Sequence, residues 1–153
     1  MTGARRGGQH ATGRLALAVA ASLCALALPV AAATVHVEVD GIEPGGGQVR
    51  VALCQGGLSE ASCSRGDDAP ASADRALFTF RGVAPGTYAV AAYQDGNGNG
   101  RLDRTGLGLP LEPYGFSGGI GRRGRPDFAE AAFALRDPGV AVRVRLARAL
   151  PRR

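Results

Sequence analysis

The chain has 153 residues, with 18 Lys and Arg, 13 Asp and Glu, and a formal net charge of +5. Three of the arginines precede residue 15 and no acidic residue does, so residues 34–153 carry 15 basic and 13 acidic side chains, a net charge of +2. These 15 arginines are scattered along the chain rather than interleaved with aromatic residues. The composition therefore argues against a nucleic-acid-binding protein.

The N-terminal residues follow the order of a secretory signal peptide. The early arginines precede an uncharged apolar run, Leu15–Val30, and Ala31 and Ala33 then occupy the small-residue positions of an A-x-A cleavage site. A membrane anchor is the alternative, but the run is shorter than the roughly 20 residues that a spanning helix needs. We predict a cleaved segment at residues 1–33, a mature domain at 34–153 without a stable membrane span, and a periplasmic or secreted location.

Cleavage at this point would remove Cys24 and leave Cys54 and Cys63. An even pair of cysteines in an exported chain predicts a disulfide. The spacing, CQGGLSEASC, fits neither a C-x-x-C redox pair nor the usual spacing of zinc ligands. Such a bridge would close a short loop and contribute about 2–3 kcal/mol in the chain-entropy account.

The first two predicted strands follow from a period of two. Valine alternates with polar residues over 34–40, and the alternation resumes over 48–54, which indicates two half-buried strands. The glycine-rich segment between them predicts that they form a β-hairpin. Residues 55–73 are small and polar and predict a loop.

Three or four further strands are predicted towards the C-terminus. Residues 75–80 form one, with Leu77 on the opposite face from the two phenylalanines, and a Pro-Gly turn leads into another at 87–94. Residues 127–135 and 140–150 give two more candidates, separated by an Asp-Pro-Gly turn. Residues 127–135 have a short helix as the alternative, because their alanines favour helix. Short strands with Gly and Pro turns predict an all-β sandwich.

The stretch YQDGNGNGRLD, residues 93–103, has oxygen donors at every second position, as cation loops do. Counting Asp95 as the first position of such a loop, the predicted ligands are Asp95, Asn97, Asn99, Arg101 through its backbone carbonyl, and Asp103. The twelfth position is Gly106 instead of an acid, so the predicted cofactor is weakly bound calcium, with Glu112 available only if the chain folds back. The alternative is a bare turn, in which Asn and Gly supply left-handed conformations and the two aspartates bond nearby amides.

The motifs around this loop also carry a family resemblance. A Pro-Gly-x-Tyr strand start, the Asp-x-Asn-x-Asn-Gly-x-Leu-Asp loop, a Gly-x-Pro and a Tyr-Gly-Phe-Ser follow one another over residues 85–117. Their order and spacing resemble the secreted family known as domain of unknown function 2141. The resemblance implies an exported, prealbumin-like sandwich and no particular activity. The predicted fold class is all-β: a single immunoglobulin-like or prealbumin-like antiparallel β-sandwich of about seven strands.

The leading functional hypothesis is a non-catalytic exported β-sandwich, structural or adhesive at the cell envelope, with a weak calcium loop. The alternative is a module that binds an envelope component (a glycan, a peptide or an acidic polymer) through Tyr114, Phe116 and the basic pair Arg122–Arg123, although packing is the more usual role of such aromatic residues. A metal-assisted hydrolase that uses the acids of the loop ranks third. Residues 34–153 contain one histidine, His36, and no acid or nucleophile is paired with it in the sequence, so no enzymatic activity is predicted.

Overall fold

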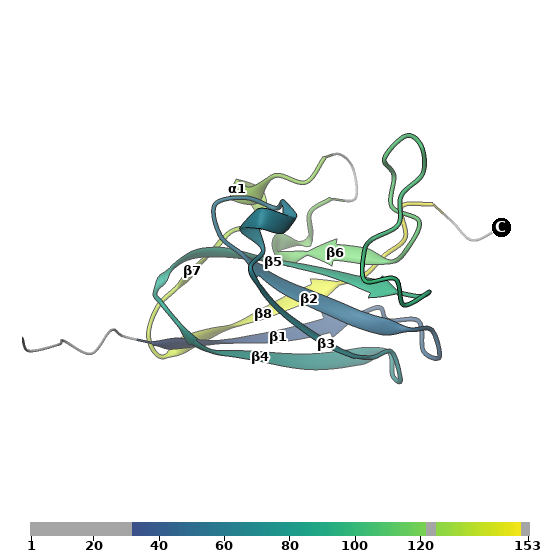
Figure 1. Ribbon diagram of the computed structural model, residues 1–153. Coiled ribbons are helices and arrows are strands. Elements are labelled where there is room, and N and C mark those ends of the chain that lie inside the picture. The colour runs from purple at the N-terminus through teal and green to yellow at the C-terminus, as the bar shows by residue number, and fades with distance from the viewer. Residues whose placement is uncertain (1–31, 122–124, 151–153) are drawn as a thin grey trace, which may run out of the picture.

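The computed structural model describes residues 32–121 and 125–150. The apolar run of the predicted signal peptide and the basic pair Arg122–Arg123 lie outside these residues. Eight strands form two sheets that pack face to face as a sandwich, which confirms the predicted fold class (Figure 1). No helix in the described part of the chain is long and apolar enough to cross a membrane.

The first sheet has three strands in the order β4-β1-β8. Its central strand β1 (Ala33–Asp40) pairs antiparallel with β4 (Arg75–Val83) and parallel with β8 (Gly139–Arg145). The prediction of a purely antiparallel sandwich is therefore wrong for one pair. The chain reaches β8 from the second sheet and enters it at the end where β1 also begins, so the two strands run in the same direction.

The second sheet is antiparallel throughout. Its main path is β3 (Arg65–Pro70), β2 (Gln48–Cys54), β5 (Gly86–Asp95) and β6 (Tyr114–Phe116). The short strand β7 (Phe133–Leu135) pairs with the beginning of β5, while β6 pairs with a later part of it. Strand β5 thus runs the full length of this sheet and ends at Asp95, where the candidate loop begins.

The predicted hairpin between β1 and β2 is wrong, because the two strands belong to different sheets. The segment 41–47 crosses from one layer to the other, with Ile42 buried as it does so. At the end of this crossing, Gly47 has φ of 69° and lies so close to the backbone of Asp95 that a side chain would collide with it. Alternation shows that a strand has one buried face, but it does not show which strand lies beside it.

The prediction that residues 55–73 form a loop is wrong in part, because they contain the 3-10 turn η1 (Glu60–Ser62) and strand β3. Strand β3 has no buried residue, so its sequence shows no apolar alternation. It lies at the edge of the second sheet, where its acidic residues and Pro70 suit an unpaired edge. The predicted disulfide is confirmed: Cys54 at the end of β2 is bonded to Cys63, which ties this segment to the sheet.

Residues 127–135 combine the two alternatives considered for them. Asp127 caps the short helix α1 (Phe128–Ala131), its side chain accepting a hydrogen bond from the backbone N–H of Ala129 at 2.7 Å. The chain then becomes extended at Ala132 and forms β7. A second 3-10 turn, η2 (Ser117–Gly119), follows β6 and contacts α1.

The core lies between the two sheets and is built from the residues that the alternation placed inwards. Phe78 and Phe80 of β4 are buried, and Leu77, which precedes them on the opposite face, is exposed, as predicted. Its members include Val35, Val37, Val39, Phe78, Phe80 and Val144 from the first sheet and Val49, Val51, Leu53, Val90 and Leu135 from the second. Side chains of this kind contribute about 1.5–3 kcal/mol each when fully buried.

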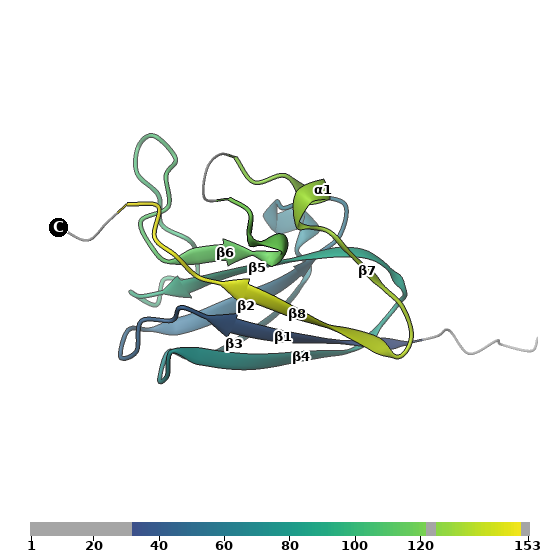
Figure 2. The same ribbon diagram turned by 180° about the vertical axis from the view of Figure 1, so that it is seen from behind.

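Three connecting segments gather at one end of the sandwich. The crossing 41–47, the connection from β5 to β6 and the segment after β8 all lie there (Figure 1). The turns between β4 and β5 and between β7 and β8 lie at the other end (Figures 1 and 2). The β5–β6 connection, residues 96–113, contains all the predicted cation ligands except Asp95, which immediately precedes it.

Candidate functional site: the β5–β6 connection

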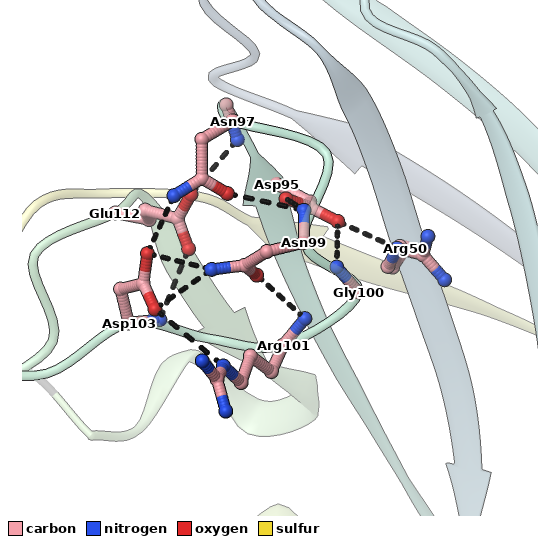
Figure 3. A network of polar contacts seen from close by, with 9 residues as sticks. Arg50, Asp95, Asn97, Asn99, Gly100, Arg101, Asp103 and Glu112 are labelled. Carbon is pink, nitrogen blue, oxygen red and sulfur yellow. Dashed lines mark hydrogen bonds and ion pairs between the residues drawn. The ribbon is translucent and has the colours of Figure 1, made fainter.

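Asp95 is the last residue of β5, and its side chain is fully buried. Its Oδ1 accepts a hydrogen bond from the backbone N–H of Asn99 at 3.1 Å, and Oδ2 accepts one from that of Gly100 at 2.8 Å. Oδ2 also accepts from Arg50 Nε at 3.0 Å, an ion pair with the neighbouring strand β2 (Figure 3). Asp95 therefore ties the start of the connection to the sheet.

The electrostatic surroundings of Asp95 favour its charged form. Burial raises the pKa of the carboxyl group. The hydrogen bonds from the Arg50 side chain and from backbone amides, that of Gly100 foremost, outweigh burial and hold the pKa below its ordinary value. The carboxylate is therefore ionised at neutral pH. An ionised, buried carboxylate needs these donors, because without them its desolvation would destabilise the fold.

Each of the two asparagine side chains stabilises a turn with its oxygen and donates a hydrogen bond to an acidic side chain with its amide N–H group. Asn97 Oδ1 accepts from the backbone N–H of Asn99 at 3.1 Å, and Asn99 Oδ1 accepts from that of Arg101 at 3.0 Å, which makes two successive Asx turns. Their amide groups donate to the Asp103 carboxylate, from Asn97 Nδ2 at 2.7 Å and from Asn99 Nδ2 at 3.0 Å. Gly98 and Gly100 have φ of 73° and 81°, the left-handed conformation expected of glycines in such a loop.

Glu112 closes the connection from its far end. Its Oε1 accepts from the backbone N–H of Gly96 at 2.8 Å and its Oε2 from that of Asp103 at 3.1 Å. The side chain thus folds back over the loop and approaches the predicted ligands. One carboxylate therefore holds together two points of the loop that are seven residues apart in the sequence.

The predicted ligands lie in two groups. Asn97, Asn99, Asp103 and Glu112 face one another on one side of the loop, whereas Asp95 points to the other side, towards Arg50 (Figure 3). The Arg101 side chain lies near the first group, with Nε 4.0 Å from Asp103 Oδ1. Over residues 32–121 and 125–150, no three His, Cys, Asp or Glu side chains are grouped so as to hold a metal ion.

A second polar network, which the sequence analysis missed, lies beside this loop. A cleft of about 620 Å³ lies between the crossing 41–47, the β5–β6 connection and Arg148. Gln94, buried on β5, accepts from the backbone N–H of Glu43 at 2.9 Å and donates to the carbonyls of Glu43 and Gly46 at 2.8 and 2.6 Å. No sequence pattern marks this contact, because Gln94 and Glu43 are 51 residues apart.

Arg148 completes the network from the segment after β8. It forms a two-point ion pair with Glu43, Nε to Oε1 at 2.9 Å and Nη2 to Oε2 at 2.7 Å, and donates from Nη1 to the carbonyl of Leu111 at 2.8 Å. The hydrogen bond to Glu43 raises the pKa of Arg148, so the guanidinium stays charged at neutral pH. The network fastens three segments of the loop-bearing end to one another.

The residues of the Tyr-Gly-Phe-Ser motif make packing contacts with the rest of the sandwich. Tyr114 and Phe116 are half-buried on β6, with their ring centroids 6.0 Å apart edge to face, and the Tyr114 hydroxyl donates to the carbonyl of Gly121 at 2.6 Å. Any side chain at Gly115 would collide with the carbonyl of Arg145 in β8. These contacts assign the aromatic pair a packing role, and the predicted ligand surface stays a prediction.

Ser117, the last residue of the motif, is buried. Its hydroxyl accepts from the backbone N–H of Val90 at 2.9 Å and donates to the carbonyl of Ala131 at 2.6 Å. The side chain therefore satisfies the backbone N–H of Val90, where β5 pairs with neither β6 nor β7, and the last carbonyl of α1. At the other end of β6, Tyr114 bridges to Ala147 in the segment after β8 (Figure 2).

These features define a class of protein: a two-sheet β-sandwich with a disulfide and a long, internally bonded Asp/Asn/Gly connection at one end. A family model described as an uncharacterized protein conserved in bacteria, DUF2141, matches residues 37–143, so the chain belongs to this family, as the resemblance predicted. No curated protein and no solved structure matched the chain.

Proposed function

We propose that this protein is a non-catalytic structural module, periplasmic or secreted, whose β5–β6 connection binds Ca²⁺ weakly. The observation that carries the proposal is the gathering of the Asp103 and Glu112 carboxylates with the Asn97 and Asn99 side chains on one side of the loop (Figure 3). Carboxylate and amide oxygens are the ligands that Ca²⁺ takes in proteins. The Cys54–Cys63 disulfide supports an oxidising compartment.

The proposal gives the two aspartates different roles. Asp95 shapes the loop, because its oxygens are occupied by backbone amides and Arg50. Asp103 and Glu112 are the anionic ligands. For the two asparagine oxygens to face the ion, their amides would have to rotate and give up the Asx-turn hydrogen bonds that these oxygens now accept. Two carboxylates and neutral oxygens predict a dissociation constant of about 10⁻⁴–10⁻³ M, the range of weak extracellular modules.

A bare turn is the competing account, and it also rests on an observation. Every carboxylate of the loop already has donors within the protein: Arg50 and backbone amides at Asp95, asparagine amides at Asp103, and backbone amides at Glu112. In that account the loop keeps its shape without an ion. The two accounts differ in whether calcium adds stability.

Thermal unfolding distinguishes them, using a chain that begins at Ala32 and contains the whole sandwich core. At a calcium concentration about five times the dissociation constant, binding to the folded state adds about 1 kcal/mol, a rise of a few degrees in Tm. The rise is expected with calcium and not with magnesium. It should disappear in Asp103→Asn and Glu112→Gln and persist in the matched control Asp74→Asn, which changes an exposed acid outside the loop.

Asp95→Asn adds a sharper arm to the same experiment. Because the proposal assigns Asp95 to the shape of the loop, this variant should start from a lower Tm yet keep most of the calcium increment. A wild-type Tm that is the same in chelator and in calcium, or that rises equally with magnesium, would rule out the calcium site and establish the bare turn.

A further inference from the structure

The second half of the β5–β6 connection forms a small projecting hairpin, residues 104–111, which we call the finger. Thr105 N–H donates to the carbonyl of Leu109 at 2.8 Å and Gly108 N–H to that of Thr105 at 2.8 Å, and the Thr105 hydroxyl accepts from Leu109 N–H at 3.1 Å. Gly108 has φ of 81°, so the tip is a tight turn closed by a left-handed glycine. The finger is thus a defined structure rather than a slack loop.

This defined structure presents leucine to the solvent. Leu107 at the tip is 91% exposed, and Leu109 and Leu111 on the returning arm are 44% and 46% exposed. Leu109 and Leu111 are two residues apart in an extended segment and so lie on one side of it, while Pro110 between them is buried. Three exposed leucines on one short projection form an apolar surface of the kind that marks an interaction site.

Positive charge accompanies the leucines. Arg104 is exposed and its Nη1 donates to the carbonyl of Gly108 at 3.1 Å, which holds the guanidinium beside the turn. The Arg101 side chain, 75% exposed, lies just before the finger. Residues 104–111 contain no acid, and the two acids that flank them are already hydrogen-bonded, Asp103 to the two asparagine amides and Glu112 to backbone amides.

We propose that the finger inserts into the headgroup region of an anionic lipid bilayer, with Leu107 leading and the arginines at the level of the phosphates. The projection is convex, and a bilayer accepts an apolar convex tip without a matching groove, which a protein partner would have to supply. From Asp103 to Leu107 an extended chain rises on the order of 10 Å. This reach is comparable with the roughly 5–10 Å depth of interfacial apolar groups.

A matched control exists elsewhere on the molecule. Leu77 is 75% exposed, within the range of the finger leucines, but it lies on the outer face of β4. Strand β4 and the loops of the β5–β6 connection are on opposite sides of the molecule in both views (Figures 1 and 2). A bilayer contact made through the finger therefore leaves Leu77 in water.

Co-sedimentation with vesicles tests the proposal, using the chain from Ala32 in chelator so that the result is independent of calcium. The wild type should bind vesicles of phosphatidylethanolamine and phosphatidylglycerol, and bind them less as salt rises. Leu107→Ser should lower the partition coefficient by about tenfold or more, because it removes a leucine side chain from the apolar layer. Leu77→Ser should leave it unchanged.

Each other outcome overturns the proposal. If the wild type did not bind vesicles, the bilayer would be excluded as the target, and a protein partner would become the alternative. Binding that survives Leu107→Ser, or that Leu77→Ser weakens equally, would mean that the finger is not the contact. Equal binding to phosphatidylcholine vesicles would exclude an anionic surface as the target. Circular dichroism of each variant checks that the fold is intact. Both variants are expected to fold, because Leu107 and Leu77 are largely exposed.

Discussion

The two halves of the β5–β6 connection are held in opposite ways. Residues 96–103 are fastened to the sandwich through the carboxylates of Asp95 and Glu112, and their polar side chains bond to one another. Residues 104–111 are bonded mainly to themselves and leave three leucines in water. Groups that hold a fold together are buried and paired, whereas a surface kept for contact is exposed. The first half therefore belongs to the fold, and the second is free to serve recognition.

The largest effect is expected where this comparison depends on Asp95. Asp95→Ala removes the acceptor for Arg50 and for the backbone amides of Asn99 and Gly100. Breaking a buried pair costs about 3–5 kcal/mol, and because the Arg50 side chain is 34% exposed we expect the lower end, about 3 kcal/mol. Urea unfolding measures this, with Asp74→Ala as the exposed control.

A double-mutant cycle with Arg50→Ala separates the ion pair from the backbone contacts. In that background Asp95→Ala should cost clearly less, because part of its effect has already been lost. An unchanged cost would show that Arg50 contributes nothing and that the loop is fixed by its own amides alone.

A second effect follows from the lowered pKa of Asp95. The folded-state pKa lies below that of the unfolded chain, about 3.9, so the ionised carboxylate stabilises the fold above that pH. This contribution is lost as the pH falls from about 5 through the folded-state pKa. Denaturant unfolding over this range should show the wild type losing stability more steeply than Asp95→Asn. Parallel pH profiles would mean that Asp95 has the same proton affinity in both states.

The local alternation of apolar and polar residues predicted where most strands lie, but not which strands pair with one another. Val35, Val37 and Val39 alternate with polar residues, and this alone placed β1 and its inward face. The partners of β1 are set by contacts with residues 35 to 105 positions away, which no local signal records. Strand β3 was not predicted because both of its faces are exposed to solvent. A strand without a buried face shows no alternation of apolar and polar residues.

The candidate site divides in the same way. The spacing of Asp95, Asn97 and Asn99 identified the loop, because the Asx turns that shape it are local. The residues that fasten it are distant in sequence: Arg50 lies 45 residues before Asp95, and Arg148 lies 105 residues after Glu43. Arg50 is one polar residue of an alternating strand, and nothing nearby in the sequence distinguishes it from the others.

The smallest expected effect provides the strictest test of the comparison. Leu107→Ser changes a side chain that is 91% exposed and leaves the Thr105–Gly108 and Thr105–Leu109 hydrogen bonds in place, because all of them use other residues. A surface change of this kind should alter the free energy of unfolding by no more than about 0.5 kcal/mol. Urea unfolding beside Asp95→Ala gives the contrast directly. If Leu107→Ser destabilised the protein as much as Asp95→Ala, the finger would be part of the folded core's support, and its exposed leucines would need no partner to explain them.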